Sequence, residues 1–398
     1  MDEVRGFDSH LRALTLGLLL FFCVATSAAQ THDVLCLHGS DSFSTVFQTG
    51  VQARVGAAKN DGLSVRACEA VLSWGNQRLT VASEAAAADL DAFGVDLGLG
   101  VPVAAFQIQK SDSDCCRTYQ IYSLQKPLRL LRTITGGDFF SASDTDLDGR
   151  IEIWTDDAAA VNGFDNMSAA ELDFAPPVIL RFEHNRLLDV SSEFQHYFDQ
   201  LIASLRKQID SQDLRDFKNS DAKLTPGALP VEQMHRLRAV KIKALEIVWA
   251  YLYSGREEEA WKALASLWPV ADFERVRVAI TEVRRNGIRA QVDGASSGAP
   301  SAKKKHAQIF NVGLTMGHST QELVPPQEII LRQPPPPIEI LLDLLIDSAG
   351  KVRAAESANG KPVEADLMKA VTEWKFVPAF SGGSPVACKL RIAVSERR

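Results

Sequence analysis

A long stretch without any regular hydrophobic pattern, residues 289–337, divides this chain of 398 residues into parts that we expect to fold separately. The middle of the stretch is small, polar and basic, and it ends in four consecutive prolines, Pro334–Pro337. Consecutive prolines favour the extended polyproline II conformation, which acts as a semi-rigid spacer. The stretch therefore predicts a linker, followed by a separate module at residues 338–398.

Residues 30–187 predict a mainly antiparallel β domain. Short runs rich in β-forming residues alternate there with clusters of Gly, Asp, Asn and Ser. The alanine-rich run Ala85–Ala88 interrupts this rhythm and predicts a short helix. The expected strands are Val34–Leu37, Ser64–Trp74, Val101–Gln109, Arg117–Leu124, Leu128–Ile134 and Arg150–Trp154, with a closing strand pair in Ile179–Leu188.

Residues 188–288 predict helical hairpins, because apolar residues recur there three and four positions apart. Ser192 and Gln195 predict a capping box at the start of the first helix. A polar stretch, Asp210–Leu229, separates this helix from the next block, and Asp272 predicts the N-cap of the last helix. The whole chain is therefore expected to be an α+β multidomain protein.

The N-terminus has the layout of a secretory signal. Arg5 and Arg12 precede an apolar run, Leu14–Ala25, and the small residues Ser27–Ala29 follow it. We expect residues 1–29 to be a signal peptide that is cleaved after Ala29, so that the mature protein is exported. The alternative is a retained membrane anchor, although the apolar run is shorter than the roughly 20 residues that a spanning helix needs.

Export places the cysteines in an oxidising compartment, where disulfides form. Five remain after cleavage, so at least one stays free or pairs between chains. We predict a bridge between Cys36 and Cys68, because both lie in the N-terminal domain. Cys115 and Cys116 could supply a partner instead, and Cys388 falls on the apolar side of a predicted strand, which favours a buried thiol.

The net charge argues against a nucleic-acid partner. At −7 the chain lacks the basic surface that displaces counterions from a phosphate backbone. The same charge argues against docking on anionic lipid through charge alone. No motif for a small-molecule cofactor is evident.

The segment from Asp144 to Glu152 predicts a calcium loop. Acidic residues stand at alternate positions around Gly149, which permits a sharp turn, and calcium is bound by several hard oxygens in such a loop. The pattern resembles the DxDxDGxxE loops of FG-GAP and VCBS-type β-propeller blades. The predicted metal ligands are Asp144, Asp146, Asp148, Arg150 and Glu152. The alternative is an acidic, solvated β-turn.

The last part of the chain returns to a regular pattern. Apolar residues alternate from Ile338 to Ile346, which predicts a strand, and Asp347–Gly350 predicts a hairpin turn. Leu367, Ala370, Val371 and Trp374 then follow helical spacing. After Gly382 and Gly383, apolar residues alternate again from Val386 to Val394, which predicts a final strand.

This ββαβ order, and the residues Ile346-Asp347-x-x-Gly350-Lys351-Val352 followed by Trp374-Lys-Phe376-x-Pro378-Ala379, resemble the C-terminal domain of TonB over residues 338–395. The resemblance implies a periplasmic module of a Gram-negative bacterium that follows a proline-rich spacer. It implies binding to another envelope protein, such as an outer-membrane receptor, by addition of an extended segment at a sheet edge. The implied partner-binding edge strand is Leu390, Arg391, Ile392, Ala393 and Val394.

These observations favour a periplasmic protein-interaction protein, connected with TonB-dependent transport across the outer membrane. One alternative is an energy transducer of the TonB type that stays anchored in the inner membrane and faces the periplasm. A second alternative is a secreted hydrolase with its site in the β domain. The sequence carries no GxSxG elbow and no paired-carboxylate motif, so we predict no catalytic residues and no enzymatic activity.

Overall fold

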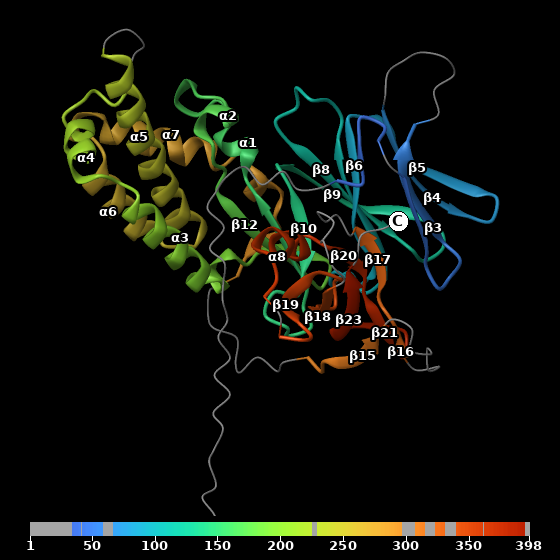
Figure 1. The fold of residues 1–398 in the computed structure, drawn as a ribbon. Helices are drawn as coiled ribbons and strands as arrows, with labels where there is room; N and C mark the ends of the chain where they lie inside the picture. Colours follow the sequence, from blue (N-terminus) through green and yellow to red (C-terminus); the bar gives the residue numbers. More distant parts are fainter. Residues whose placement is uncertain are drawn as a thin grey trace, which may run out of the picture.

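The computed structural model describes residues 34–40, 42–58, 67–224, 229–296, 307–314, 323–330, 340–360 and 362–394. Within these residues the protein is an α+β structure with a β-rich end, a helical end and the C-terminal module between them (Figure 1). The predicted signal peptide, its cleavage at Ala29 and the tetraproline lie outside the described residues. No helix in the described part of the chain is long and apolar enough to cross a membrane.

Two antiparallel sheets form the N-terminal part. One has the order β2-β3-β4-β5 and the other β1-β6-β7-β8-β9. Side chains from both sheets share one apolar core, and a disulfide between Cys36 of β1 and Cys68 of β4, with an S–S distance of 2.06 Å, joins the sheets as predicted. The strands are β1 (Cys36–Leu37), β2 (Ser42–Val46), β3 (Gln52–Ala57), β4 (Cys68–Trp74), β5 (Gln77–Ala85), β6 (Ala87–Val95), β7 (Val103–Gln109), β8 (Arg117–Ser123) and β9 (Arg129–Gly137).

The helix predicted at Ala85–Ala88 is wrong. Ala85 ends β5, and Ala87 and Ala88 begin β6, where all three side chains are buried. A small side chain suits a strand that is covered on both faces, so burial overrides the helical preference of alanine here. Cys388 is a buried free thiol, as the sequence indicated. Cys115 and Cys116 are bonded to each other and so do not supply a partner for Cys36 or Cys68.

A third sheet, with the order β10-β11-β12-β13-β14, carries the acidic loop and supports the helices. Its strands are β10 (Phe140–Ser143), β11 (Glu152–Asp156), β12 (Pro177–Glu183), β13 (Arg186–Asp189) and β14 (Gly294–Ala295). Two short helices, α1 (Ala158–Val161) and α2 (Ala169–Leu172), connect β11 to β12. The core of this sheet continues without a break into the helices.

The helical part consists of α3 (Gln195–Lys207), α4 (Ser211–Lys218), α5 (Val231–Tyr253), α6 (Glu257–Leu267) and α7 (Phe273–Val283). The predicted capping box is absent, because the Gln195 amide donates to the carbonyls of Ser192 and Ser254 and Phe194 takes the N-cap position. Asp272 is the N-cap of α7, but its side chain makes no capping bond and accepts instead from Trp268 and Arg275. Helix α4 lies in the polar stretch that was expected to separate two helical segments, and Asp210 caps it.

The C-terminal module contains the expected strands and helix, namely β18 (Ile340–Ile346), β19 (Val352–Ser357), α8 (Ala365–Thr372) and β23 (Cys388–Val394). Three short strands stand between α8 and β23: β20 (Lys375–Val377), β21 (Ala379–Ser381) and β22 (Ser384–Val386). The side chains of β23 alternate between buried and exposed along its whole length. Its buried face joins Leu367 and Val371 of α8 in a core of the module's own.

Residues 289–337 are not the structureless linker that the sequence predicted. Their described parts contain β14 of the third sheet and three strands that pair with the C-terminal module. These are β15 (Phe310–Leu314), β16 (Leu323–Val324) and β17 (Gln327–Ile330), which pair with β23, β21 and β20. The sheet of the module therefore has the order β15-β23-β18-β19.

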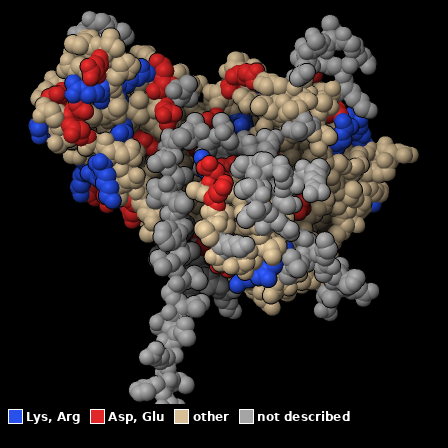
Figure 2. All heavy atoms as spheres, viewed as in Figure 1, with Lys and Arg blue, Asp and Glu red and all other residues tan. Residues whose placement is uncertain are grey.

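The C-terminal module packs into the rest of the molecule. Ala349 belongs to the core of the third sheet and the helices, and Val377 and Phe380 belong to the core of the two N-terminal sheets. Phe380 lies 6.2 Å from Phe47, measured between ring centroids. On the visible face of the molecule, charged side chains of both signs are interspersed over the helical part, while the β part is mainly uncharged (Figure 2).

Candidate functional site

The acidic loop connects β10 to β11, and its backbone folds around the Asp144 carboxylate. The Asp148 N–H donates to Asp144 Oδ1 and the Gly149 N–H donates to Asp144 Oδ2, each over 3.0 Å. Gly149 has a φ of +87°, which lies in the left-handed region that favours glycine. The sequence reading of Gly149 as the turn residue is therefore confirmed.

Three of the five predicted metal ligands come together in this loop. Asp144, Asp146 and Asp148 each place one carboxylate oxygen within 4.8 Å of the other two. Asp144 is fully buried, whereas Asp146 and Asp148 are half-buried. Carboxylate oxygens in such a cluster are the ligands that hard divalent cations prefer, so the cluster could hold a metal ion.

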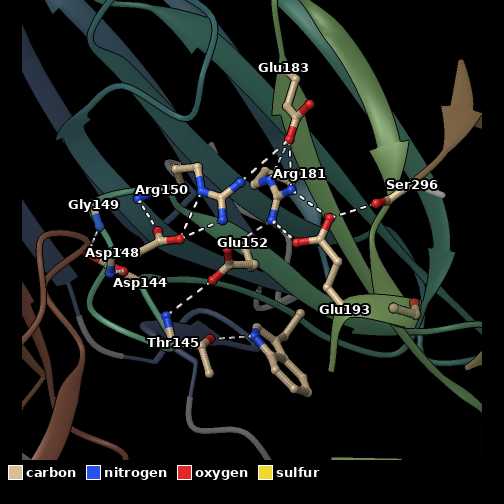
Figure 3. Close-up of polar contacts among 12 residues, drawn as sticks. Asp144, Thr145, Asp148, Gly149, Arg150, Glu152, Arg181, Glu183, Glu193 and Ser296 are labelled. Carbon is tan, nitrogen blue, oxygen red and sulfur yellow. Dashed lines mark hydrogen bonds and ion pairs between the residues drawn. The ribbon is translucent and has the colours of Figure 1, made fainter. Parts of the chain in front are cut away.

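The other two predicted ligands, Arg150 and Glu152, are not part of this cluster, and their side chains make ion pairs instead (Figure 3). The Arg150 guanidinium donates to Asp148 Oδ2 from Nε over 2.9 Å and from Nη2 over 2.6 Å. Glu152 is fully buried, accepts from the Thr145 N–H over 3.2 Å and faces Arg181 Nη1 at 3.5 Å. A guanidinium cannot bind a cation, so the Arg150 side chain is not a metal ligand, and Glu152 belongs to a neighbouring ion-pair network.

Arg181 is the centre of that network. It lies on β12 with only 3% of its surface exposed. Its guanidinium donates to Glu183 over 2.7 Å and to Glu193 over 2.9 Å, and Ser296 donates to the same Glu193 over 2.7 Å (Figure 3). Although burial raises the pKa of Glu193, the hydrogen bonds from Arg181 outweigh that effect and lower it. This arginine therefore joins three carboxylates from different parts of the chain.

Burial makes two carboxylates of the loop, those of Asp144 and Glu152, harder to ionise. It raises the pKa of Asp144 to about 6, and the nearby Asp347 adds to the effect, whereas a hydrogen bond from Ser348 opposes it. Burial also raises the pKa of Glu152 to about 8, and the negative charge of Asp146 contributes. A cation bound to Asp144 would oppose the effect of burial on that residue, because a cation stabilises the ionised form of its ligands.

The turn of the C-terminal module, Asp347–Gly350, docks on the acidic loop. Ser348 Oγ donates to Asp144 Oδ2 over 3.0 Å. In return, Asp347 Oδ2 accepts from the Asp144 N–H and from Ser143 Oγ, each over 3.0 Å. The sequence predicted both turns but gave no sign that they meet, because the contact joins segments about 200 residues apart.

Two ion pairs hold the module against β6. Lys351 Nζ lies 2.6 Å from Asp91 Oδ1, and Lys375 Nζ lies 2.5 Å from Asp89 Oδ2. Both aspartates are almost fully buried, and Asp91 also accepts from the Tyr119 hydroxyl over 2.6 Å. Buried carboxylates require such partners, so the pairs fix the position of the module on the sheet.

The predicted partner-binding edge is partly covered by the chain itself. Strand β15 runs parallel to β23, with Phe310 opposite Cys388 and Leu314 opposite Arg391. Of the five predicted edge residues, Leu390 and Arg391 therefore already have a neighbouring strand on that side. Ile392, Ala393 and Val394 extend beyond the end of this pairing among the described residues. The expectation of an entirely free edge was wrong, because the segment taken for a linker supplies a strand.

A cavity of about 410 Å³ lies where these parts meet. Its wall includes Gly149 and Arg150 of the loop, Arg181 of β12, Ser348 of the module and Phe310 of β15. The acidic loop, the docked turn and β15 thus form one continuous region. Comparison of the chain with protein-family models, with curated proteins and with solved structures gave no match.

Proposed function

We propose that this is an exported protein-binding protein that engages an extended segment of another envelope protein along the edge of β23. The observation that carries the proposal is β15. It is an extended segment that pairs in parallel with Cys388–Arg391 of β23, in a region where the sequence indicated a spacer. An edge strand that accepts a segment of its own chain has the main-chain geometry needed to accept a segment of a partner.

The main-chain groups available for such pairing can be named. The Phe310 N–H donates to the Ala387 carbonyl over 2.9 Å, so the main chain of Ala387 faces β15. Because the N–H and C=O groups of a strand alternate in direction, the main-chain groups of Arg391 and Ala393 face the same side. Those of Ala393 lie past the end of β15 and offer a place for a partner segment to begin pairing.

The sequence pattern supports the class of partner. Residues 338–395 resemble the C-terminal domain of TonB, a module that binds outer-membrane receptors by strand addition. The N-terminal signal layout agrees with a periplasmic location. We therefore propose an outer-membrane receptor or another periplasm-facing protein as the partner, in connection with TonB-dependent transport.

We further propose that calcium binds Asp144, Asp146 and Asp148 and braces the junction between the β part and the C-terminal module. Asp144 Oδ2 accepts from both Gly149 and Ser348, whereas Oδ1 accepts only from the Asp148 N–H, so Oδ1 keeps a lone pair that suits a hard cation. Asp144 also accepts from Ser348, so a cation held there would stabilise the docked turn. The ion would neutralise the crowded negative charge of the loop.

The test of partner binding is a comparison of captured proteins from detergent-solubilised outer membranes, with the full chain as bait. Ala393→Pro removes one edge N–H that faces away from β18, and edge strands tolerate proline there. We expect this variant to lose the partner that the wild-type chain captures. Glu356→Ala changes an exposed side chain on β19, which β18 separates from β23, so this variant should capture the partner normally. Equal capture by wild type and Ala393→Pro would rule out pairing at this edge.

A further inference from the structure

The pairing of β15 with β23 is short and irregular. It comprises four residue pairs, and the register shifts between Asn311 and Gly313. Ile309, just before the strand, is 41% exposed. A short edge strand with a bulge contributes few ladder bonds, so little free energy holds it in place compared with the long pairing of β18 with β23.

The side chains of β15 nevertheless make specific contacts. Phe310 and Val312 are half-buried and pack against the core of the C-terminal module. The Ala307 N–H, just before the strand, donates to the Leu147 carbonyl of the acidic loop over 2.7 Å. The segment therefore connects the module's edge to the loop, and it presents apolar side chains at two alternate positions to the module.

We infer that β15 is an internal occupant of the partner-binding edge, which a partner segment must displace. This inference rests on the proposed function. It adds how partner binding at β23 is regulated and which side chains the partner segment carries. Since β15 occupies the same main-chain groups, a partner segment that covers Cys388–Arg391 competes with it directly. The competing segment runs parallel to β23 and carries apolar side chains at the two positions of Phe310 and Val312. Only molecules in which β15 has left the edge can bind the partner segment. The apparent affinity for the partner is therefore reduced in proportion to the fraction of such molecules.

The test uses the full chain and a fluorescent synthetic peptide with the sequence of residues 307–314, AQIFNVGL. Phe310→Pro removes the N–H that donates to Ala387 and so releases β15 from the edge. Val312→Lys weakens the same strand by placing a charge against the module core, and it serves as a second variant that does not depend on proline. Ile309→Ala is the matched control, because it alters an exposed side chain next to the strand.

We expect the peptide, followed by fluorescence anisotropy, to bind Phe310→Pro and Val312→Lys at least about tenfold more tightly than wild type and Ile309→Ala. A peptide with aspartate in place of its phenylalanine should bind neither variant. The inference is overturned if both variants keep the wild-type circular dichroism spectrum and bind the peptide no better than wild type does. Because the probe is the chain's own segment, this outcome does not depend on the envelope partner. Tight peptide binding together with equal capture by wild type and Ala393→Pro would refute the proposed function alone.

Discussion

Ser348 donates a hydrogen bond to the Asp144 carboxylate over 3.0 Å, although 204 residues separate the two in the sequence. Both residues are buried, and the contact joins the turn of the C-terminal module to the acidic loop of the third sheet. It shows that the module is an integral part of the molecule. The position of the module therefore depends in part on the fold of the acidic loop.

Removing this hydrogen bond should weaken the junction. Ser348→Ala leaves Asp144 with its two main-chain donors, so we expect the free energy of unfolding to fall by about 1 kcal/mol. Urea denaturation of the full chain measures the effect. Ser357→Ala, whose hydroxyl contacts the exposed Asn359, is the control and should change the stability much less. An equal loss in both variants would contradict the proposed importance of the Ser348 contact.

The ion pair between Lys351 and Asp91 should matter more. Lys351→Ala leaves a buried carboxylate without its cation, and breaking such a pair costs about 3–5 kcal/mol. Lys389→Ala removes a lysine whose side chain is exposed on β23, and it should be nearly neutral. Thermal unfolding of both variants beside wild type checks the difference. Similar melting temperatures for all three proteins would show that the module does not depend on this pair.

The stability of the helical part should depend on pH through Glu246 of α5. Burial raises the pKa of Glu246 to about 7, and Asp173 adds to the effect. The folded state then binds more protons than the unfolded state, so this contribution is fully present below about pH 4.5 and is lost as the pH rises through 7. The free energy of unfolding falls by up to about 1.4 kcal/mol per pH unit in that window.

Glu246→Gln removes the titration and keeps the shape of the side chain. We expect the variant to match wild type near pH 4 and to be the more stable protein at pH 8, as measured by urea denaturation. The measurement at pH 4 is the internal control. A constant difference between the two proteins at every pH would contradict this assignment.

Calcium should stabilise the protein if Asp144, Asp146 and Asp148 bind it. At a concentration about a hundredfold above the dissociation constant, the gain is about 2.7 kcal/mol. We expect the melting temperature to rise with calcium relative to chelator in wild type and to be unaffected by calcium in Asp146→Asn. If wild type melts at the same temperature with calcium and with chelator, the loop does not bind calcium and is an acidic turn.

The sequence predicted the parts of the fold that depend on local pattern. The alternation along β18 and β23 and the spacing of Leu367 and Val371 located the strands and helix of the C-terminal module, because each has one buried face. Spacing also located the three aspartates of the loop. Helix α4 was missed, although Asp210 in front of it is a normal N-cap residue and could have indicated it.

What the sequence did not predict depends on contacts between distant segments. Strand β15 has only five residues, so the alternation of Phe310 and Val312 with Asn311 and Gly313 is too short to predict a strand without knowledge of its pairing with β23. The contact of Ser348 with Asp144 and the position of Lys351 against Asp91 require the folded arrangement of three separate parts of the chain. Glu152 was expected to bind the ion because of its spacing, but Arg181 on a neighbouring strand holds it instead.

The central claim is that β15 closes part of the β23 edge, and amide hydrogen exchange of the full chain tests it most directly. In wild type, the amides within Cys388–Arg391 of β23 that face β15 should exchange slowly. In Phe310→Pro they should exchange roughly tenfold faster or more, because β15 no longer protects them, while the amides of β18 keep their wild-type rates. Unchanged exchange along β23 in a folded Phe310→Pro variant would contradict the account.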